Sequence, residues 1–144
     1  MTRERMVELL NEDLAREYQA IISYIIYSQT LKGAEYMQIA AELEKHASEE
    51  LSHALKIANQ IDYLNGTPTN KAKEVKMSDK PRDMLKFDLE NERKTLINYR
   101  QRVCQADEMG EYALGEVLRE IMAQEQEHLI DLATALGIDT PKLE

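Results

Sequence analysis

Residues 43–57 read LEKHASEELSHALKI, a stretch that places a glutamate and a histidine on the apolar side of an expected helix. Its apolar residues recur at intervals of four, seven and three positions, as on one face of an amphipathic helix: Leu43, Ala47, Ala54 and Ile57. Glu50 lies within that stripe, and the spacing Glu50-x-x-His53 puts both side chains on the same helix face. Because a surface helix normally keeps its glutamates on the solvent side, this arrangement indicates a polar cluster in the core.

The second half of the chain repeats this arrangement 75 residues later. Residues 118–132 read LREIMAQEQEHLIDL, in which Glu125-x-x-His128 again lies on an apolar stripe. Glu17 and Glu92 also lie on apolar helix faces, and each precedes the Glu-x-x-His of its own half by 33 residues. The positions that repeat are Asp13/Asp88, Leu14/Leu89, Glu17/Glu92, Tyr24/Tyr99, Glu50/Glu125 and His53/His128. Since the midpoint of each Glu pair falls in an expected turn, two helical hairpins would bring all six ligand-type side chains to one level of the core.

Glycine and proline mark the ends of four expected helices and so define the fold class. The expected helices cover about residues 3–32, 34–64, 81–107 and 111–136. The two short turns between them force antiparallel neighbours, whereas the polar stretch 67–80 is long enough to run the length of a bundle. We therefore expect residues 1–144 to form a single all-α domain, a four-helix bundle with one long crossover between helices 2 and 3.

The composition supports this fold class and excludes several others. The chain has 144 residues, a net charge of −9, five Gly, three Pro, one Phe and no Trp, which disfavours an all-β fold. A single cysteine, Cys104, excludes a disulfide framework within the chain. The most apolar stretch, Ala20 to Tyr27, is far shorter than the roughly 20 residues of a membrane span. We expect a cytoplasmic protein with no membrane association and no general affinity for nucleic acid.

Four buried carboxylates require compensating positive charge, because an unpaired buried charge is strongly destabilising. Four carboxylates and two neutral imidazoles match the charge of two divalent ions. Oxygen-rich ligands with one histidine per ion suit iron, with manganese or zinc as substitutes. The alternative is that these glutamates face solvent or neighbouring Lys and Arg side chains in another helix register. In that case the cluster is structural and the bundle is a non-catalytic interaction module.

Four stretches of the sequence carry a resemblance to a known family: residues 10–17 (LNEDLARE), 49–53 (EELSH), 64–68 (LNGTP) and 84–92 (MLKFDLENE). The chain resembles the ferritin-like diiron carboxylate proteins over nearly its whole length, and the bacterioferritins most. The resemblance implies a ferritin-like bundle with two iron ions per chain. The implied ligands are Glu17 and His53 on one ion, Glu92 and His128 on the other, and Glu50 and Glu125 bridging both. Tyr24 matches a family tyrosine beside the metals, and Tyr99 is its counterpart in the repeat.

The implied function is a ferroxidase that oxidises Fe(II) with O₂ or peroxide for iron storage or detoxification. A small non-storing diiron oxidoreductase, rubrerythrin-like in scavenging peroxide or O₂ as a dimer, remains the alternative, although no Cys-x-x-Cys electron-transfer domain follows here. Leu51 stands where bacterioferritins have their haem-ligating Met, so we expect no haem at that position. The chain also ends seven residues after Gly137, without the fifth helix of the 24-subunit cage. The sequence leaves the subunit number, the oxidant and the native metal open.

Three smaller features complete the expectations. His46 shares a helix face with Glu42, Glu49 and His53; we expect a surface histidine, with an auxiliary iron site or a route for iron as the alternative. We expect Cys104 to be an ordinary packed residue of the third helix. A second apolar face indicates a homodimer or a larger cage, and consists of Tyr18, Ile22, Ile26 and Leu51.

Overall fold

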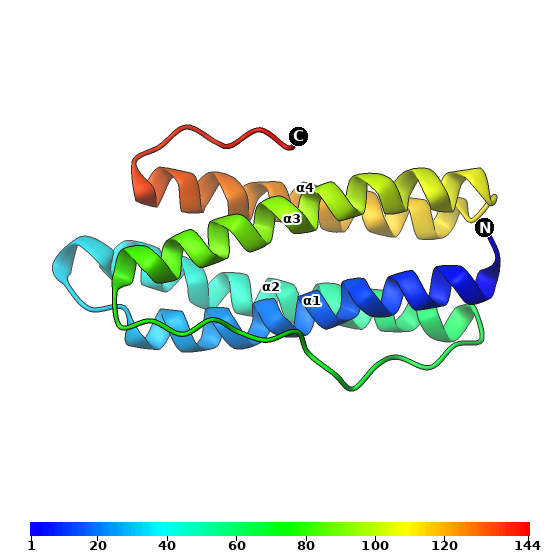
Figure 1. Cartoon of the computed structure of the whole chain (residues 1–144), viewed down its shortest axis with the longest axis horizontal. Helices are drawn as coiled ribbons and strands as arrows, with labels where there is room; N and C mark the ends of the chain where they lie inside the picture. The colour runs from blue at the N-terminus through cyan, green and yellow to red at the C-terminus, as the bar shows by residue number, and fades with distance from the viewer.

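Four long helices and no strand build the computed structural model, which describes all residues 1–144 (Figure 1). The helices are α1 (Arg3–Thr30), α2 (Met37–Tyr63), α3 (Pro81–Glu108) and α4 (Tyr112–Leu136), with a short 3₁₀ turn η1 (Ala34–Tyr36) before α2. The all-α class and the four-helix bundle predicted from the sequence are confirmed. The turn η1 occupies residues at which the sequence predicts the second helix to have already begun.

The bundle consists of two antiparallel hairpins that pack against each other. α1 pairs with α2 and α3 with α4, while α3 lies against α1 and α4 against α2. The segment between α2 and α3 returns along the full length of the bundle, so that α2 and α3 run parallel (Figure 1). This is the predicted crossover between helices 2 and 3.

Local sequence signals account for the helix ends. The Thr2 hydroxyl accepts a hydrogen bond of 3.0 Å from the Arg5 amide and caps α1. Pro81 opens α3, where a missing amide hydrogen leaves nothing unsatisfied. Gly137 ends α4 at φ 70°, a left-handed conformation that glycine adopts without steric strain.

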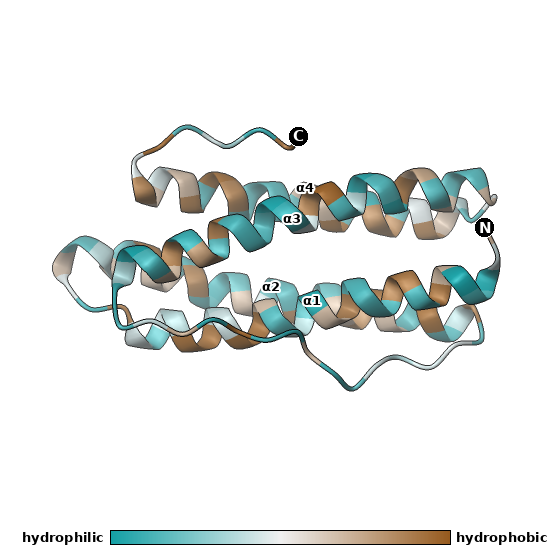
Figure 2. Cartoon of the chain, viewed as in Figure 1, coloured by the Kyte–Doolittle hydropathy of each residue, from teal (hydrophilic) through white to brown (hydrophobic).

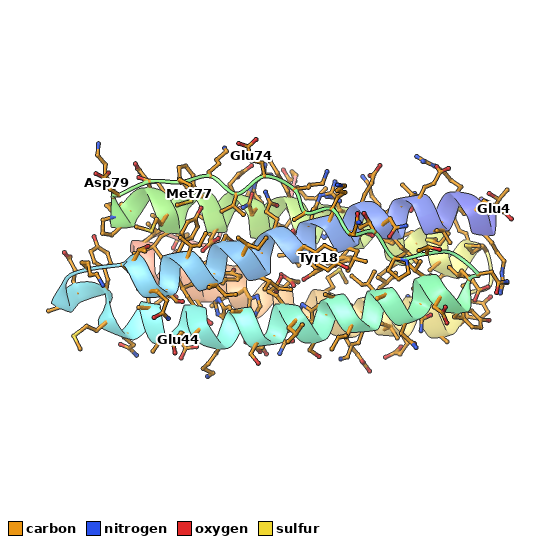
Figure 3. The ribbon with its side chains drawn as sticks, turned by 90° about the horizontal axis from the view of Figure 1, so that it is seen from below. Glu4, Tyr18, Glu44, Glu74, Met77 and Asp79 are labelled. Carbon is orange, nitrogen blue, oxygen red and sulfur yellow. The ribbon has the colours of Figure 1, made fainter.

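The crossover lies along the outside of α1 and is tied to it by hydrogen bonds. Tyr18 Oη donates to the carbonyl of Thr69 at 2.9 Å, and the Lys73 amide donates to the carbonyl of Ala15 at 3.1 Å. Figure 3 shows the segment passing along α1, with Glu74 pointing away from the bundle. Most crossover side chains are exposed, as the sequence predicts, but the backbone follows a fixed path.

Two apolar clusters fill the bundle, one toward each end. The first is built around Leu10, Leu14 and Ile57, and the second around Tyr27, Leu43 and Leu85. Hydrophilic and hydrophobic residues alternate along every helix, as amphipathic helices require (Figure 2). None of the four helices has the length and apolar content needed to cross a membrane.

The structure changes three expectations about single residues. Tyr18 and Ile26 are partly buried because they pack against the two apolar clusters of their own chain, so only Ile22 and Leu51 of the expected second apolar face are exposed. Cys104 is exposed, because it lies on the outer side of α3, and the prediction that it is a packed residue is wrong.

Candidate metal centre

Six side chains meet between the two apolar clusters, at mid-height in the bundle. α1 and α3 contribute one glutamate each, and α2 and α4 contribute one Glu-x-x-His pair each, because the antiparallel hairpins place these positions opposite one another. All are at most 3% exposed: Glu17, Glu50, His53, Glu92, Glu125 and His128. These are the six residues that the repeat in the sequence singled out, and the structure brings all of them together.

The six residues form two overlapping groups, each able to hold one metal ion. One group contains Glu17, Glu50, His53 and Glu125, and the other contains Glu50, Glu92, Glu125 and His128. Within each group, one possible ligand atom per residue lies within 4.8 Å of the others. Glu50 and Glu125 belong to both groups, which is the placement that bridging carboxylates require.

Several side-chain oxygen and nitrogen atoms of these six residues have no hydrogen-bond partner in the protein. Five buried polar atoms lack any partner: Glu17 Oε2, Glu50 Oε1, Glu92 Oε2, Glu125 Oε2 and His128 Nδ1. His128 Nδ1 and Glu50 Oε1 are only 3.1 Å apart, yet neither makes a hydrogen bond. Unsatisfied buried polar atoms destabilise a fold, whereas bound cations would coordinate them. The residues present therefore fit a pair of metal ions.

Without metal, this crowding of acids changes the protonation of the centre. Burial, and then repulsion from Glu125, raises the pKa of both Glu50 and Glu92 well above the usual range of a carboxyl. Burial disfavours a charged imidazole at His128, but the carboxylates of Glu125 and Glu92, which lie 3.7 and 3.5 Å from its Nδ1, outweigh it and raise its pKa to about 11. The pKa of His53 rises for the same reason, since its Nδ1 lies 2.6 Å from Glu125 Oε1. The metal-free centre therefore holds protons where metal ions would bind.

Glu17 and Glu92 each belong to only one of the two groups, and each accepts a hydrogen bond from a tyrosine of the opposite half of the chain. Tyr24 Oη donates to Glu92 Oε1 at 2.6 Å, and Tyr99 Oη donates to Glu17 Oε1 at 2.5 Å. Burial, and then the neighbouring carboxylates, raises the pKa of both phenols well above their usual value, so both remain donors. The structure places Tyr24 beside the cluster, as the sequence predicts, and gives Tyr99 the equivalent position.

The outer nitrogens of the two histidines contact a pair of residues that the sequence did not single out. His53 Nε2 lies 2.6 Å from Gln124 Oε1, and His128 Nε2 lies 3.3 Å from Glu49 Oε1. Gln124 Nε2 also donates to Glu49 Oε2, so the four side chains form one chain of contacts. The repeat carried this signal, because positions 49 and 124 are also 75 residues apart. Such contacts fix the orientation and tautomer of a metal-binding imidazole.

The expectation that His46 is a surface residue is wrong. Its side chain is 1% exposed because α2 turns it into the bundle, where its ring stacks on His128 with ring centres 3.9 Å apart. Tyr24 lies against the same ring edge-on at 5.0 Å. His46 Nε2 contacts Asp131 Oδ2 at 3.1 Å, and burial lowers the pKa of the imidazole.

Comparison with known protein families matches residues 7–139 to the family described as "Ferritin-like domain". Curated relatives are bacterioferritins. That of Brucella melitensis is 25% identical over 135 residues, covering 93% of this chain and 84% of that protein. That of Mycobacterium bovis is 26% identical over 134 residues, covering 92% of this chain and 84% of that protein.

Among solved structures, a similar chain is described as a ferritin-like, diiron-carboxylate protein from Bacillus anthracis. It superposes with a TM-score of 0.90 at 34% identity, over 94% of this chain and 99% of that one. The similarity therefore extends over the helices that carry all six buried side chains.

Proposed function

The chain belongs to the ferritin-like domain family, and on that premise we propose that its buried cluster binds two iron ions and oxidises Fe(II). The observation that carries the proposal is the pair of four-residue groups that share Glu50 and Glu125 within a layer closed to solvent. Bacterioferritins and a diiron-carboxylate protein among the relatives support the choice of iron.

In this proposal, each ion has its own glutamate and histidine. Glu17 and His53 hold one ion, Glu92 and His128 hold the other, and two carboxylates bridge them. Four carboxylates and two neutral imidazoles balance two divalent charges, so the loaded centre is neutral within the apolar core. The same ligand set also accepts Mn(II) or Zn(II), which makes these ions useful as probes.

Two Fe(II) ions together supply the two electrons that reduce O₂ to H₂O₂, or H₂O₂ to water, with two protons taken up in each case. The protein's part is to position the two ions and to balance their charge. Tyr24 and Tyr99 hold Glu92 and Glu17 in place through their hydroxyls. Glu49 accepts a hydrogen bond from His128 Nε2, which leaves Nδ1 free to face the carboxylates. Loading the centre releases the protons held by the histidines.

At the biological level, we propose that this oxidation serves iron storage or detoxification in a homo-oligomer. The bacterioferritins among the relatives support this reading. Because Leu51 offers no donor atom, the proposal includes no haem at that position. The second candidate, a dimeric diiron oxidoreductase that consumes O₂ or peroxide, uses the same centre and differs only in retaining no mineral.

The decisive experiment is stopped-flow measurement of aerobic Fe(II) oxidation by the double variant E50Q/E125Q. Removing both shared carboxylates should reduce the rate to that of Fe(II) in buffer, because neither ion keeps its bridge. The matched control is E116Q/E127Q, which removes two exposed charges from α4 and should oxidise Fe(II) as the native chain does. Full activity in E50Q/E125Q would show that the chemistry occurs elsewhere.

A second measurement separates storage from redox turnover. Purified protein is loaded aerobically with increasing Fe(II), desalted, and analysed for retained iron. Retention of tens of ions per chain or more supports the storage role. Retention that stops at about two ions per chain identifies the non-storing oxidoreductase.

A further inference from the structure

A buried aspartate of α3, Asp88, lies one helical turn before Glu92 and belongs to neither metal-binding group. It is 2% exposed. Its Oδ1 accepts a hydrogen bond of 3.2 Å from Ser23 Oγ on α1, whereas its Oδ2 has no hydrogen-bond partner. An ionised carboxylate in this position would be buried without a counterion, which is strongly destabilising. The geometry therefore favours a carboxyl group that keeps its proton.

The internal repeat shows how the same fold stabilises an ionised aspartate at the equivalent place. Asp13 precedes Asp88 by 75 residues and is also 2% exposed. Arg102 of α3 donates to both carboxylate oxygens of Asp13, at 2.6 and 3.1 Å. The residue equivalent to Arg102 is Tyr27, whose hydroxyl donates to the carbonyl of Lys76 in the crossover. The chain thus provides a counterion for one buried aspartate and none for the other.

The groups that face Asp88 leave its carboxyl group protonated. The titratable ones come from α1, α4 and the crossover: Tyr24, Tyr27, His128 and Lys76. The Lys76 ammonium lies over the ring of Phe87, 5.5 Å from its centre, and forms no ion pair with Asp88. Burial raises the pKa of Asp88 well above its usual range, and the hydrogen bond from Ser23 and then the charge of His128 offset only part of this rise.

This proton is held next to the layer that contains the six ligand-type residues. Asp88 and Glu92 are four residues apart, so they share one face of α3 at a separation of about 6 Å along the helix axis. Each accepts a hydrogen bond from one of two consecutive residues of α1, Ser23 for Asp88 and Tyr24 for Glu92. Asp88 is therefore a proton-carrying group beside the proposed dinuclear centre, at a place closed to solvent.

We propose that Asp88 supplies a proton to the oxygen that is reduced at the dinuclear centre. This proposal rests on the proposed function, in which reduction of O₂ to H₂O₂ takes two electrons from two Fe(II) ions and consumes two protons. The O–H bond of the Asp88 carboxyl group breaks, and a new O–H bond forms on the reduced oxygen. The second proton comes from solvent, and Asp88 regains its own proton from solvent before the next turnover. An acid kept neutral by burial suits this task because it still holds its proton at neutral pH.

Infrared spectroscopy of the Zn(II)-loaded chain at neutral pH tests the protonation of Asp88 without any turnover. Zn(II) displaces the protons of the six ligands, so the difference between the native and D88N spectra should contain the C=O band of a buried, protonated carboxyl group. The band should shift in D₂O. D79N, which removes an exposed carboxyl group, is the matched control and should keep the band. Its absence from the native chain would overturn the proposal.

The rate of aerobic Fe(II) oxidation tests the transfer of the proton. D88N should lower kcat about 100-fold or more, as expected for loss of an acid that donates a proton. The KM for Fe(II) should not change, because all six ligands remain. The native kcat should also fall as the pH rises through the pKa of Asp88, a dependence that D88N should lack. A D88N variant with the native kcat contradicts the proposal, and D79N should oxidise Fe(II) as the native chain does.

Ser23→Ala provides a second variant that leaves Asp88 itself in place. It removes the hydrogen bond that opposes the rise in the pKa of Asp88, so the alkaline fall in kcat should move to higher pH. Ser52→Ala, at an exposed position of α2, is the matched control and should keep the native profile. A lower kcat at every pH without a shift of the profile would indicate a structural role for Ser23 and Asp88 and so refute the proton transfer.

The variant E50Q/E125Q distinguishes failure of this proposal from failure of the proposed function. If E50Q/E125Q is inactive and D88N oxidises Fe(II) at the native rate, Asp88 supplies no proton and the dinuclear centre stands. If E50Q/E125Q keeps full activity, the proposed function is wrong and the proton transfer fails with it.

Discussion

Glu49 and Gln124 show at the scale of single residues how the repeat builds the site. They occupy equivalent positions 75 residues apart, yet each contacts the histidine of the opposite half and each also contacts the other. One is an anion and the other a neutral amide, so the two imidazoles have different outer partners. This difference makes the two proposed iron positions chemically unequal.

A variant at Gln124 tests this positioning role. Gln124→Leu removes the acceptor 2.6 Å from His53 Nε2 and leaves the ring free to change tautomer. We expect Co(II) affinity at one of the two inner positions to fall about 10- to 100-fold, as is typical of lost partners of metal-binding histidines. Gln124→Glu keeps an acceptor for His53 but replaces the amide that donates to Glu49 with a second carboxyl group, so its affinity should lie between those of the native chain and Gln124→Leu. The exposed neighbour Gln126→Leu is the control, and equal affinity in both leucine variants would contradict the role.

The protonated histidines of the metal-free centre predict an unusual pH dependence of stability. His128 has a pKa raised to about 11 in the fold and about 6.5 when unfolded. Between these values the folded chain holds the extra proton, so this contribution is complete below pH 6.5 and is lost as the pH rises toward 11. The raised pKa of His53 acts in the same direction.

Urea unfolding of the metal-free chain between pH 6.5 and 8.5 measures this effect. The free energy of unfolding should fall by roughly 1 kcal/mol per pH unit for each such histidine once the pH exceeds the pKa of the unfolded imidazole. Loading with Zn(II) should abolish the fall, because the metal replaces the protons and binds more tightly as the pH rises. A metal-free chain that becomes more stable over this range would show that the histidines are neutral when the centre is empty.

At the scale of elements, the crossover is the part of the chain whose path the sequence least determined. Its polar composition predicts exposure, but side chains of α1 hold its backbone in place. The Asn11 amide donates to the carbonyl of Thr67 at 3.0 Å, and its Oδ1 accepts from the Thr69 amide at 2.8 Å. Asn11 thus fixes the start of the crossover, just after α2 ends.

Asn11→Ala tests the contribution of this attachment. Losing both hydrogen bonds should lower the free energy of unfolding by about 1–2 kcal/mol, since one typical bond contributes about 1 kcal/mol. Urea denaturation compares it with Asn59→Ala, which removes an exposed amide from α2. Fe(II) oxidation should be unchanged, because Asn11 lies away from the six buried ligand-type residues. Equal stability of the two variants would mean that the crossover is held mainly by its other contacts.

At the scale of the whole molecule, α1 and α2 expose large apolar side chains that do not pack inside the bundle. Ile22, Ile25, Leu51 and Leu55 are 41–65% exposed. Apolar exposure on this scale is typical of a surface that packs against another copy of the same chain. The proposed homo-oligomer would bury these residues.

Leu55→Glu tests this assembly. Placing a charge on a side chain that is 65% exposed should leave the fold intact but reduce the molecular mass measured by light scattering during size-exclusion chromatography. Met77→Glu on the crossover, 67% exposed, is the control and should leave the mass unchanged. If Leu55→Glu keeps the native mass, assembly uses another surface.

The sequence by itself determined the helices, their hairpin order and the grouping of six side chains. It could do so because helical periodicity is a local signal and the 33-residue spacing occurs in both halves of the chain. Folding each half into an antiparallel hairpin therefore brings the same positions opposite one another. The burial of Glu17 or Glu125 followed from the apolar residues one turn on either side.

Only the tertiary structure decided which residues surround the six. The contacts of Gln124 with His53 and of His46 with Asp131 join helices far apart in the chain, and their geometry depends on how α2 and α4 face each other. Helical spacing places His46 on a face of α2, but its burial depends on which neighbour covers that face. The centre was therefore predictable from the repeat, whereas the buried position of His46, which has no histidine counterpart in the other half, became visible only once the helices were packed.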